Sequence, residues 1–220
     1  MGSSPFLVIA IIFMKFILGK KLEMSQIFDE KGNVVPVTLV SAGPCVVLQK
    51  KSSLTTGQDK TKKRNEGYDA IQIGFDKISK KNKIKKSMKG KEYKYIKEFR
   101  GGDENVKVGD EVTVSLFKEG DKVTVVATSK GKGFQGAVKR HGFHGRNATH
   151  GAKHEARTVG SIGQRFPQHT IKGRRMPGRM GVDRVTVKNL KIAKIDLENN
   201  ILALKGAVPG HRGTLLEIRG

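Results

Sequence analysis

The sequence predicts a mainly β protein: a closed antiparallel β-barrel that carries a basic insertion and a long extended arm. Three observations support this architecture. Short runs of β-branched and aromatic residues recur along the chain, and turn residues separate them. Their regular spacing favours a barrel, because closure leaves no strand edge exposed. The segment 129–183 interrupts the pattern with a stretch rich in glycine, lysine and arginine.

The N-terminal half supplies the first predicted strands. We assign 14–49 to the first barrel strands and 68–75 to a further barrel strand within 50–97. The rest of 50–97 is dense in lysine, and we interpret it as basic insertions, solvated and partly helical. The runs expected to form strands in 14–49 are Phe16–Leu18, Ser25–Phe28, Val35–Val40 and Cys45–Gln49.

A hairpin and a group of closing strands complete the predicted barrel. Within 98–128, Glu111–Phe117 and Lys122–Ser129 alternate apolar and polar residues on either side of the turn Lys118–Asp121. The closing strands expected in 184–220 are Arg184–Val187, Lys191–Leu197, Ile201–Lys205 and Thr214–Ile218.

The charge of the chain limits its class of partner. Forty-three Lys and Arg against 20 Asp and Glu give a net charge of +23. Such a field attracts polyanions, and binding to phosphates releases condensed counterions. Nucleic acid is therefore the expected partner, and direct RNA contact remains an alternative to simple solvation for the lysine-rich stretch Lys77–Lys97.

The segment 129–183 is predicted to be an extended arm that RNA orders. From Ser129 to Gly181 it holds twelve Lys and Arg, eleven Gly and one acid, Glu155. It cannot bury enough apolar surface to offset an ordering cost of about 1–2 kcal/mol per residue. Glycine permits close backbone approach to RNA, while Arg and Lys contact phosphates. The expected RNA-binding residues are Lys130, Lys132, Gln135, Lys139, Arg140, His141, His144, Arg146, His150, Lys153, Arg157, Arg165, Lys172, Arg174, Arg175 and Arg179.

Two patterns in the arm are typical of other kinds of site. Gly131–Val138 matches the G-x-G-x-x-G nucleotide fingerprint, but Gly142 and Gly145 interrupt the helix that should follow. The second pattern is a group of four histidines without thiolates or a carboxylate cluster, among cations that would repel a metal ion. We therefore expect no metal and no cofactor. The histidines are His141, His144, His150 and His154.

His154 and Glu155 could be drawn as an acid–base pair, but no nucleophile or pocket accompanies them. We favour a solvated Glu155 or one that pairs with an arginine.

The lone cysteine, Cys45, lies in the apolar run Pro44–Leu48 and is expected to be a buried structural thiol in a reducing compartment. The apolar stretch Phe6–Leu18 is broken by Lys15 and is too short to span a bilayer, so no membrane partner is expected.

Six segments carry a resemblance to a known family: Met14–Lys21, Met24–Phe28, Thr128–Gly136, Gly160–Gly163, Lys172–Gly181 and Lys205–Gly210. Together they resemble the bacterial-type ribosomal protein L-three family of the large subunit, and the match runs from Met14 to the C-terminus. Glu23 and Ser25 replace the usual Gly and Thr, and Val159 stands where Pro is common. Residues 1–13 lie outside the match and come either from an upstream start codon or from a genuine extension.

This resemblance implies a structural protein of the cytoplasmic ribosome that is not an enzyme and has no small-molecule substrate. It implies a barrel of the translation-protein type and an arm that runs through large-subunit rRNA toward the peptidyl transferase centre. It also implies an early role in subunit assembly and neighbours among other large-subunit proteins. The segments 135–146 and 172–181 would line the approach, and Gln164 is a candidate for methylation. The expected arm tip comprises Gln164, Arg165, Phe166, Pro167 and Gln168.

Two functions from other classes stay open at this point. One is a nucleotide-dependent enzyme that uses the glycine loop, which ATP or NAD binding would reveal. The other is a membrane-associated basic protein held by Phe6–Leu18, which sedimentation with membranes would reveal.

Overall fold

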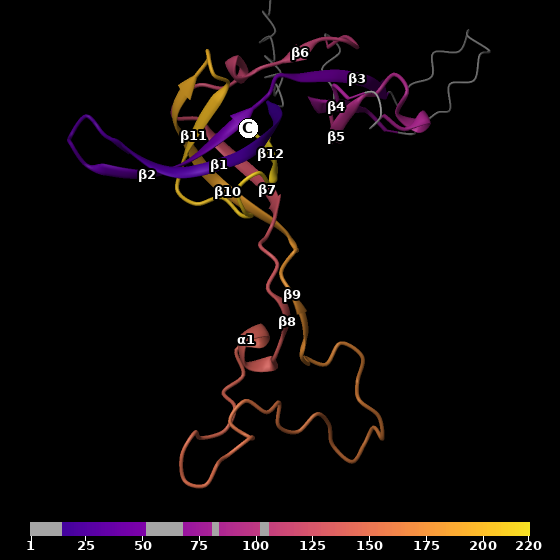
Figure 1. The fold of residues 1–220 in the computed structure, drawn as a ribbon, viewed down its shortest axis with the longest axis vertical. Coiled ribbons are helices and arrows are strands. Elements are labelled where there is room, and N and C mark those ends of the chain that lie inside the picture. The colour runs from indigo at the N-terminus through magenta and orange to yellow at the C-terminus, as the bar shows by residue number, and fades with distance from the viewer. Residues whose placement is uncertain (1–14, 52–67, 81–83, 102–105) are drawn as a thin grey trace, which may run out of the picture. The chain divides into compact units, whose positions relative to one another are not determined.

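A computed structural model describes residues 15–51, 68–80, 84–101 and 106–220 (Figure 1). The described residues divide into two compact units, one within Met1–Ala127 and Thr186–Gly220 and the other Thr128–Val185. Strands dominate the described residues, so the prediction of a mainly β protein is confirmed. The predicted extension 1–13 lies outside the described residues.

Six strands of the first unit form a ring in which hydrogen bonds connect each strand to the next. Their order is β1-β12-β7-β10-β11-β2, and β1 also pairs with β2, so the sheet returns to its starting strand. The ring is built on Ile17, Leu18, Val125, Leu204 and Ile218, all fully buried. The strands are β1 Phe16–Phe28, β2 Val34–Ala42, β7 Lys122–Thr128, β10 Arg184–Asp196, β11 Ile201–Lys205 and β12 Leu215–Arg219.

Strand β1 joins two runs that the sequence predicts as separate strands. Charged residues divide the runs, but the structure continues the strand through them, with a bulge between Lys21 and Met24. The Lys21 ammonium donates hydrogen bonds to the carbonyl oxygens of Val208 and Gly210, at 2.6 and 3.1 Å. The charged residues that interrupt the apolar pattern therefore include a lysine, Lys21, whose hydrogen-bond partners lie in a loop far away in sequence. The local sequence pattern does not reveal these partners.

A second sheet, with the order β5-β4-β3-β6, corrects the assignment of two predicted barrel strands. The segments Cys45–Gln49 and 68–75 were expected in the barrel, but β3 and β4 pair with each other and not with the ring. Apolar pattern identifies a strand without naming its partner, because pairing is set by contacts distant in sequence. The strands are β3 Cys45–Lys51, β4 Ala70–Lys77, β5 Tyr93–Arg100 and β6 Glu111–Val112.

The lysine-dense stretch Lys77–Lys97 is only partly an insertion. Its last residues begin β5, and its single short helical element among the described residues is a 3₁₀ turn at Lys86–Met88. Pairing with β4 brings Phe99 opposite Ile71, and both are buried in the core that the second sheet shares with the ring. The apolar side chains spaced along this basic stretch thus reflect a strand that sequence reasoning missed.

The predicted hairpin of Glu111–Phe117 with β7 is wrong. Only β6 is extended there, and a 3₁₀ turn follows at Val114–Leu116. Val114 and Phe117 are both buried. They lie three residues apart, which is the spacing that places side chains on one side of a 3₁₀ turn. The apolar residues of this short segment fit both the alternation of a strand and the three-residue spacing of a 3₁₀ turn. Burial of Val114 and Phe117 in the core favours the turn.

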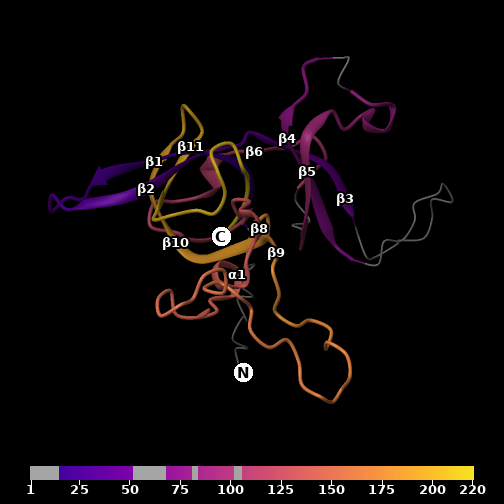
Figure 2. The same cartoon turned by 60° about the horizontal axis from the view of Figure 1, so that its bottom comes forward.

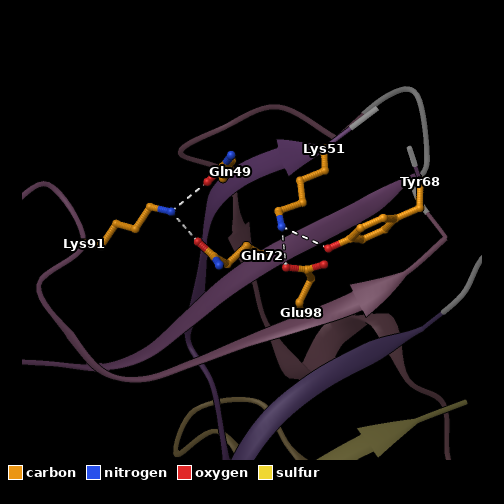
Figure 3. Close-up of polar contacts among 6 residues, drawn as sticks. All are labelled: Gln49, Lys51, Tyr68, Gln72, Lys91 and Glu98. Atoms are coloured by element: carbon orange, nitrogen blue, oxygen red, sulfur yellow. Dashed lines mark hydrogen bonds and ion pairs between the residues drawn. The ribbon is translucent and has the colours of Figure 1, made fainter. Parts of the chain in front are cut away.

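The face of the second sheet opposite the buried Ile71 and Ile73 carries a row of polar side chains (Figure 3). Gln49, Gln72 and Glu98 lie directly across from one another on β3, β4 and β5. Lysines connect the row. Lys91 Nζ donates to the Gln49 and Gln72 amide oxygens at 2.7 and 2.5 Å, and Lys51 Nζ lies 3.0 Å from the Glu98 carboxylate and 3.1 Å from the Tyr68 hydroxyl.

Cys45 is fully buried at the start of β3, as predicted. Its Sγ lies 3.5 Å from the Leu18 carbonyl oxygen. Burial raises the pKa of the Cys45 thiol to about 12, against a smaller opposing effect of the Leu18 hydrogen bond. The thiol therefore stays protonated near neutral pH and acts as a small apolar side chain.

Candidate nucleic-acid interface

The two ends of the arm run side by side at its base. Strands β8 Gly133–Gln135 and β9 Gly178–Met180 pair antiparallel, with Gly133 opposite Met180. The Ser129 amide donates to the Asp183 carbonyl at 2.8 Å, and the Lys132 amide donates to the Met180 carbonyl at 3.0 Å. This narrow ribbon holds together segments almost fifty residues apart in sequence.

The glycine fingerprint leads into helix α1, Ala137–His141, which is only five residues long. Gly142 ends the helix in the left-handed conformation, with φ of 72°, and its amide donates to the Val138 carbonyl. The prediction that glycine interrupts this helix is confirmed. A dinucleotide fingerprint requires a longer helix after the loop, so the pattern here does not form that site.

Two predicted RNA-binding residues make contacts within the arm instead. The Arg140 guanidinium donates to the Met176 carbonyl at 2.7 Å, and His141 Nε2 lies 3.1 Å from the same oxygen. Both side chains are half-buried. Arg140 also crowds Gly178, where an added Cβ would lie 2.6 Å from its Nη1. These contacts attach α1 to β9 and to the residues just before it. Sequence reasoning missed them because the acceptor is a main-chain carbonyl that lies far away in sequence.

Glu155 forms an ion pair with Arg146. The Arg146 amide also donates to the Ala156 carbonyl at 3.1 Å, which draws the two segments together. Two roles were predicted for Glu155, solvation or pairing with an arginine, and the structure shows the pairing. Since Glu155 is the only acid from Ser129 to Gly181, the other eleven Lys and Arg of that stretch have no carboxylate within it.

Most of the predicted RNA-binding side chains are exposed, and so are several of the large apolar side chains of the arm. Phe134 is 77% exposed, Phe166 63% and Ile171 60%. Within the arm, which the structure describes completely, Ala137 is the only buried apolar residue. The predicted RNA-binding residues with exposed side chains are Lys130, Lys132, Lys139, His144, Arg146, His150, Lys153, Arg157, Arg165, Lys172, Arg174, Arg175 and Arg179.

The predicted tip, Gln164–Gln168, is exposed throughout. The Arg165 guanidinium lies 5.7 Å from the centre of the Phe166 ring. Nearby, Arg174 Nη2 donates to the Ser161 carbonyl at 3.1 Å. A pocket beside these residues is lined by Ile162, Gly163, Gln164, Pro167, His169, Ile171 and Arg174.

The structure bears on the metal-site and membrane alternatives in two ways. Among residues 15–51, 68–80, 84–101 and 106–220, no group of three or more His, Cys, Asp or Glu is placed to hold a metal ion. Within the same ranges, no helix is long and apolar enough to cross a membrane. Most of the apolar stretch Phe6–Leu18 lies outside the described residues.

Comparison with known proteins gives one consistent family. Residues 104–199 match the profile described as Ribosomal protein L3. The large ribosomal subunit protein uL3 of Carboxydothermus hydrogenoformans is 46% identical over 93% of this chain and 96% of its own length. The chain belongs to the uL3 family.

Other members of the uL3 family match over the same extent. The protein of Corynebacterium jeikeium is 48% identical over 94% of each chain, and that of Thermosipho africanus is 47% identical over 94% of this chain and 98% of its own. Membership makes the chain a structural constituent of the large ribosomal subunit and not an enzyme. The resemblance, the ribosomal location and the absence of catalysis that the sequence predicted are thereby confirmed.

Proposed function

We propose that the chain binds large-subunit rRNA through its arm, 129–183, and enters the subunit early in assembly. The tip, Gln164–Gln168, approaches the peptidyl transferase centre without taking part in its chemistry. The ring is the closed antiparallel barrel of translation proteins. The partners of the chain as a whole are rRNA and other large-subunit proteins. Gln164 is the candidate for side-chain methylation.

One observation carries this proposal: the arm is rich in cations and exposes large apolar side chains, and it has no apolar core of its own. Its cations exceed its acids by eleven from Ser129 to Gly181, and its aromatic residues Phe134 and Phe166 are exposed. Like charges repel one another, so an arm of this composition is stabilised when phosphates surround it. Packing between RNA helices supplies both the phosphates and the apolar base faces.

The side chains of the arm suit RNA in two ways. Exposed guanidiniums such as Arg175 and Arg179 can bind phosphate oxygens through two parallel hydrogen bonds. Phe166, with Arg165 beside its ring, offers a flat surface on which an unstacked base can lie. Arg140 and Arg174 play a different part, because their contacts with Met176 and Ser161 hold the arm in shape.

The salt dependence of RNA binding tests the proposal. Lys172, Arg175 and Arg179 are exposed and make no ion pair among the described residues. Replacing all three by Ala in the full chain should flatten the plot of log binding constant against log salt by about 0.7–0.9 for each lost phosphate contact. The measurement is a filter-binding titration with large-subunit rRNA over a range of salt concentrations.

A control variant removes the same charge from the first unit. Lys31, Lys122 and Lys205 are exposed there, and their replacement by Ala should leave the slope close to that of the parent chain. Equal slopes for the arm variant and the parent would place these cations away from phosphate and contradict the proposal.

A further inference from the structure

The turn end of the β1–β2 hairpin exposes an apolar surface. In Figures 1 and 2 this end extends beyond the other strands of the ring. Phe28 is 68% exposed, and Met24 and Val34 are each 55% exposed. Phe28 lies directly opposite Val34, and Met24 lies opposite Thr38. Because residues two apart on a strand share a face, these side chains lie on one face of the hairpin.

The same face is core further along β2. Thr38 and Val40 are fully buried on it, and the Thr38 hydroxyl donates to the Gly206 carbonyl at 2.7 Å. The opposite face is already covered, because Val35 and Val37 pack with Ala203 of β11. At the hairpin end one face of the two strands is therefore packed against β11, and the other face exposes apolar side chains to solvent.

Neither strand has a second neighbour at this end, within the part of the chain that the structure describes. β1 pairs with β12 only along Phe16–Lys20, and β2 pairs with β11 only along Val37–Ser41. A two-stranded ribbon is marginally stable in water, and unpaired edges and apolar faces favour contact with another chain.

The charge of the hairpin end indicates what kind of molecule covers it. From Glu23 to Val34 there are three acids and one lysine, so the segment carries −2 in a chain of +23. One of the three acids, Glu23, already has a partner, because its carboxylate lies 4.0 Å from the Arg212 guanidinium. Asp29 and Glu30 are exposed, and neither forms an ion pair with the residues described. Carboxylates at this density repel phosphates within a Debye length of about 8 Å. A second copy of the chain would bring the same acids together on the same face.

We propose that the hairpin face, formed by Met24, Phe28 and Val34 and bordered by Asp29 and Glu30, docks a basic protein of the large subunit. The partner covers the apolar side chains, and its Lys or Arg residues pair with the carboxylates. This assignment rests on the proposed function in taking other large-subunit proteins as neighbours of the chain. It divides the molecule's surface by chemistry: the arm binds RNA, and the hairpin face binds protein.

Zero-length crosslinking of unmodified large subunits tests the assignment. A carbodiimide joins a carboxylate to a lysine amine in direct contact, so Asp29 or Glu30 should form an isopeptide with a lysine of a basic ribosomal protein, identified by mass spectrometry. Crosslinks from these carboxylates only to lysines of this chain, or none at all, would overturn the proposal.

A photocrosslinker in place of Phe28 distinguishes protein from RNA. When benzoylphenylalanine replaces Phe28 in the full chain and assembled subunits are irradiated, the expected adduct is a basic protein. An rRNA adduct, or no adduct, would overturn the proposal. The matched control carries the same group in place of Phe134, where the proposed function expects an rRNA adduct. Failure at Phe134 alone would count against the RNA-binding arm and leave the docking surface standing.

Charge reversal separates electrostatic recognition from simple proximity. Asp29→Lys combined with Glu30→Lys should reduce the yield of the Phe28 protein adduct several-fold, because the partner's cations are then repelled. Glu198→Lys, at an exposed acid elsewhere in the same unit, should leave the yield unchanged. An unaltered yield in the double variant would contradict a basic partner.

Discussion

At the scale of single residues, the arginines of the arm divide into two groups that composition cannot separate. Arg140 and Arg174 donate to main-chain carbonyls, and Arg146 pairs with Glu155. Arg175 and Arg179 project into solvent. A guanidinium can donate to a carbonyl, a carboxylate or a phosphate, so composition alone does not show which acceptor lies within its reach.

Glu98 gives a test of the polar row on the second sheet. Hydrogen bonds from the Tyr68 hydroxyl and then from Lys51 lower the pKa of its carboxyl below the ordinary value of 4.5. A lowered pKa means that the folded state favours the charged form, so this contribution is present above pH 4.5 and is lost as pH falls through the folded-state pKa.

Glu98→Gln should therefore destabilise the chain at pH 7 by less than about 1 kcal/mol, since the group is partly solvated. The difference from the parent should shrink as the pH falls below 4.5. Urea denaturation of both chains at pH 7 and pH 3 measures it, and a difference that grows toward pH 3 would contradict the assigned ion pair.

At the scale of elements, the base of the arm depends on close backbone approach. Gly181 has φ of 80°, and a Cβ there would collide with the Lys130 carbonyl oxygen. Gly173 has φ of 82° but has nothing within 4 Å of an added Cβ. At both positions the left-handed backbone conformation would cost a residue other than glycine about 1–2 kcal/mol of stability. The two positions differ only in the collision of the added Cβ.

Gly181→Ala should therefore open the ribbon of β8 and β9, whereas Gly173→Ala should not. Hydrogen exchange followed by mass spectrometry on purified large subunits measures this at the Lys132 amide, which donates to Met180. Faster exchange is expected for Gly181→Ala only. Similar exchange in the two variants would show that the collision is relieved without loss of pairing.

Elements also show where local pattern is sufficient and where it is not. The strands at Val35–Val40, Cys45–Gln49 and Ile201–Lys205 were predicted correctly, because their apolar runs are continuous and bounded by turns. The stretch Glu111–Phe117 was not, because its apolar residues fit either a strand or a 3₁₀ turn. β5 was missed because its lysines obscured the alternation.

At the scale of the whole molecule, the core and the arm are separate in composition. The apolar core cluster contains residues from the ring and the second sheet and none from the arm. The first unit should therefore fold without the arm tip.

Deletion of 160–172 tests this division. The thermal unfolding temperature of the free chain should stay close to that of the parent, because none of the deleted residues is buried in the core. Subunits that contain the shortened chain should show slower peptidyl transfer or an altered response to antibiotics that act at the centre. Parent-like behaviour in both assays would contradict the proposed position of the tip.

The family, the mainly β class, the buried Cys45 and the basic arm could all be predicted from the sequence. These follow from motif, local apolar pattern and charge, which are properties of neighbouring residues. The folded chain was needed to show that β3 and β4 leave the ring, that Arg140 and His141 converge on Met176, and that the hairpin face is left open. Each of these depends on which distant segments meet, and pairing between distant segments is set by the packing of the whole chain.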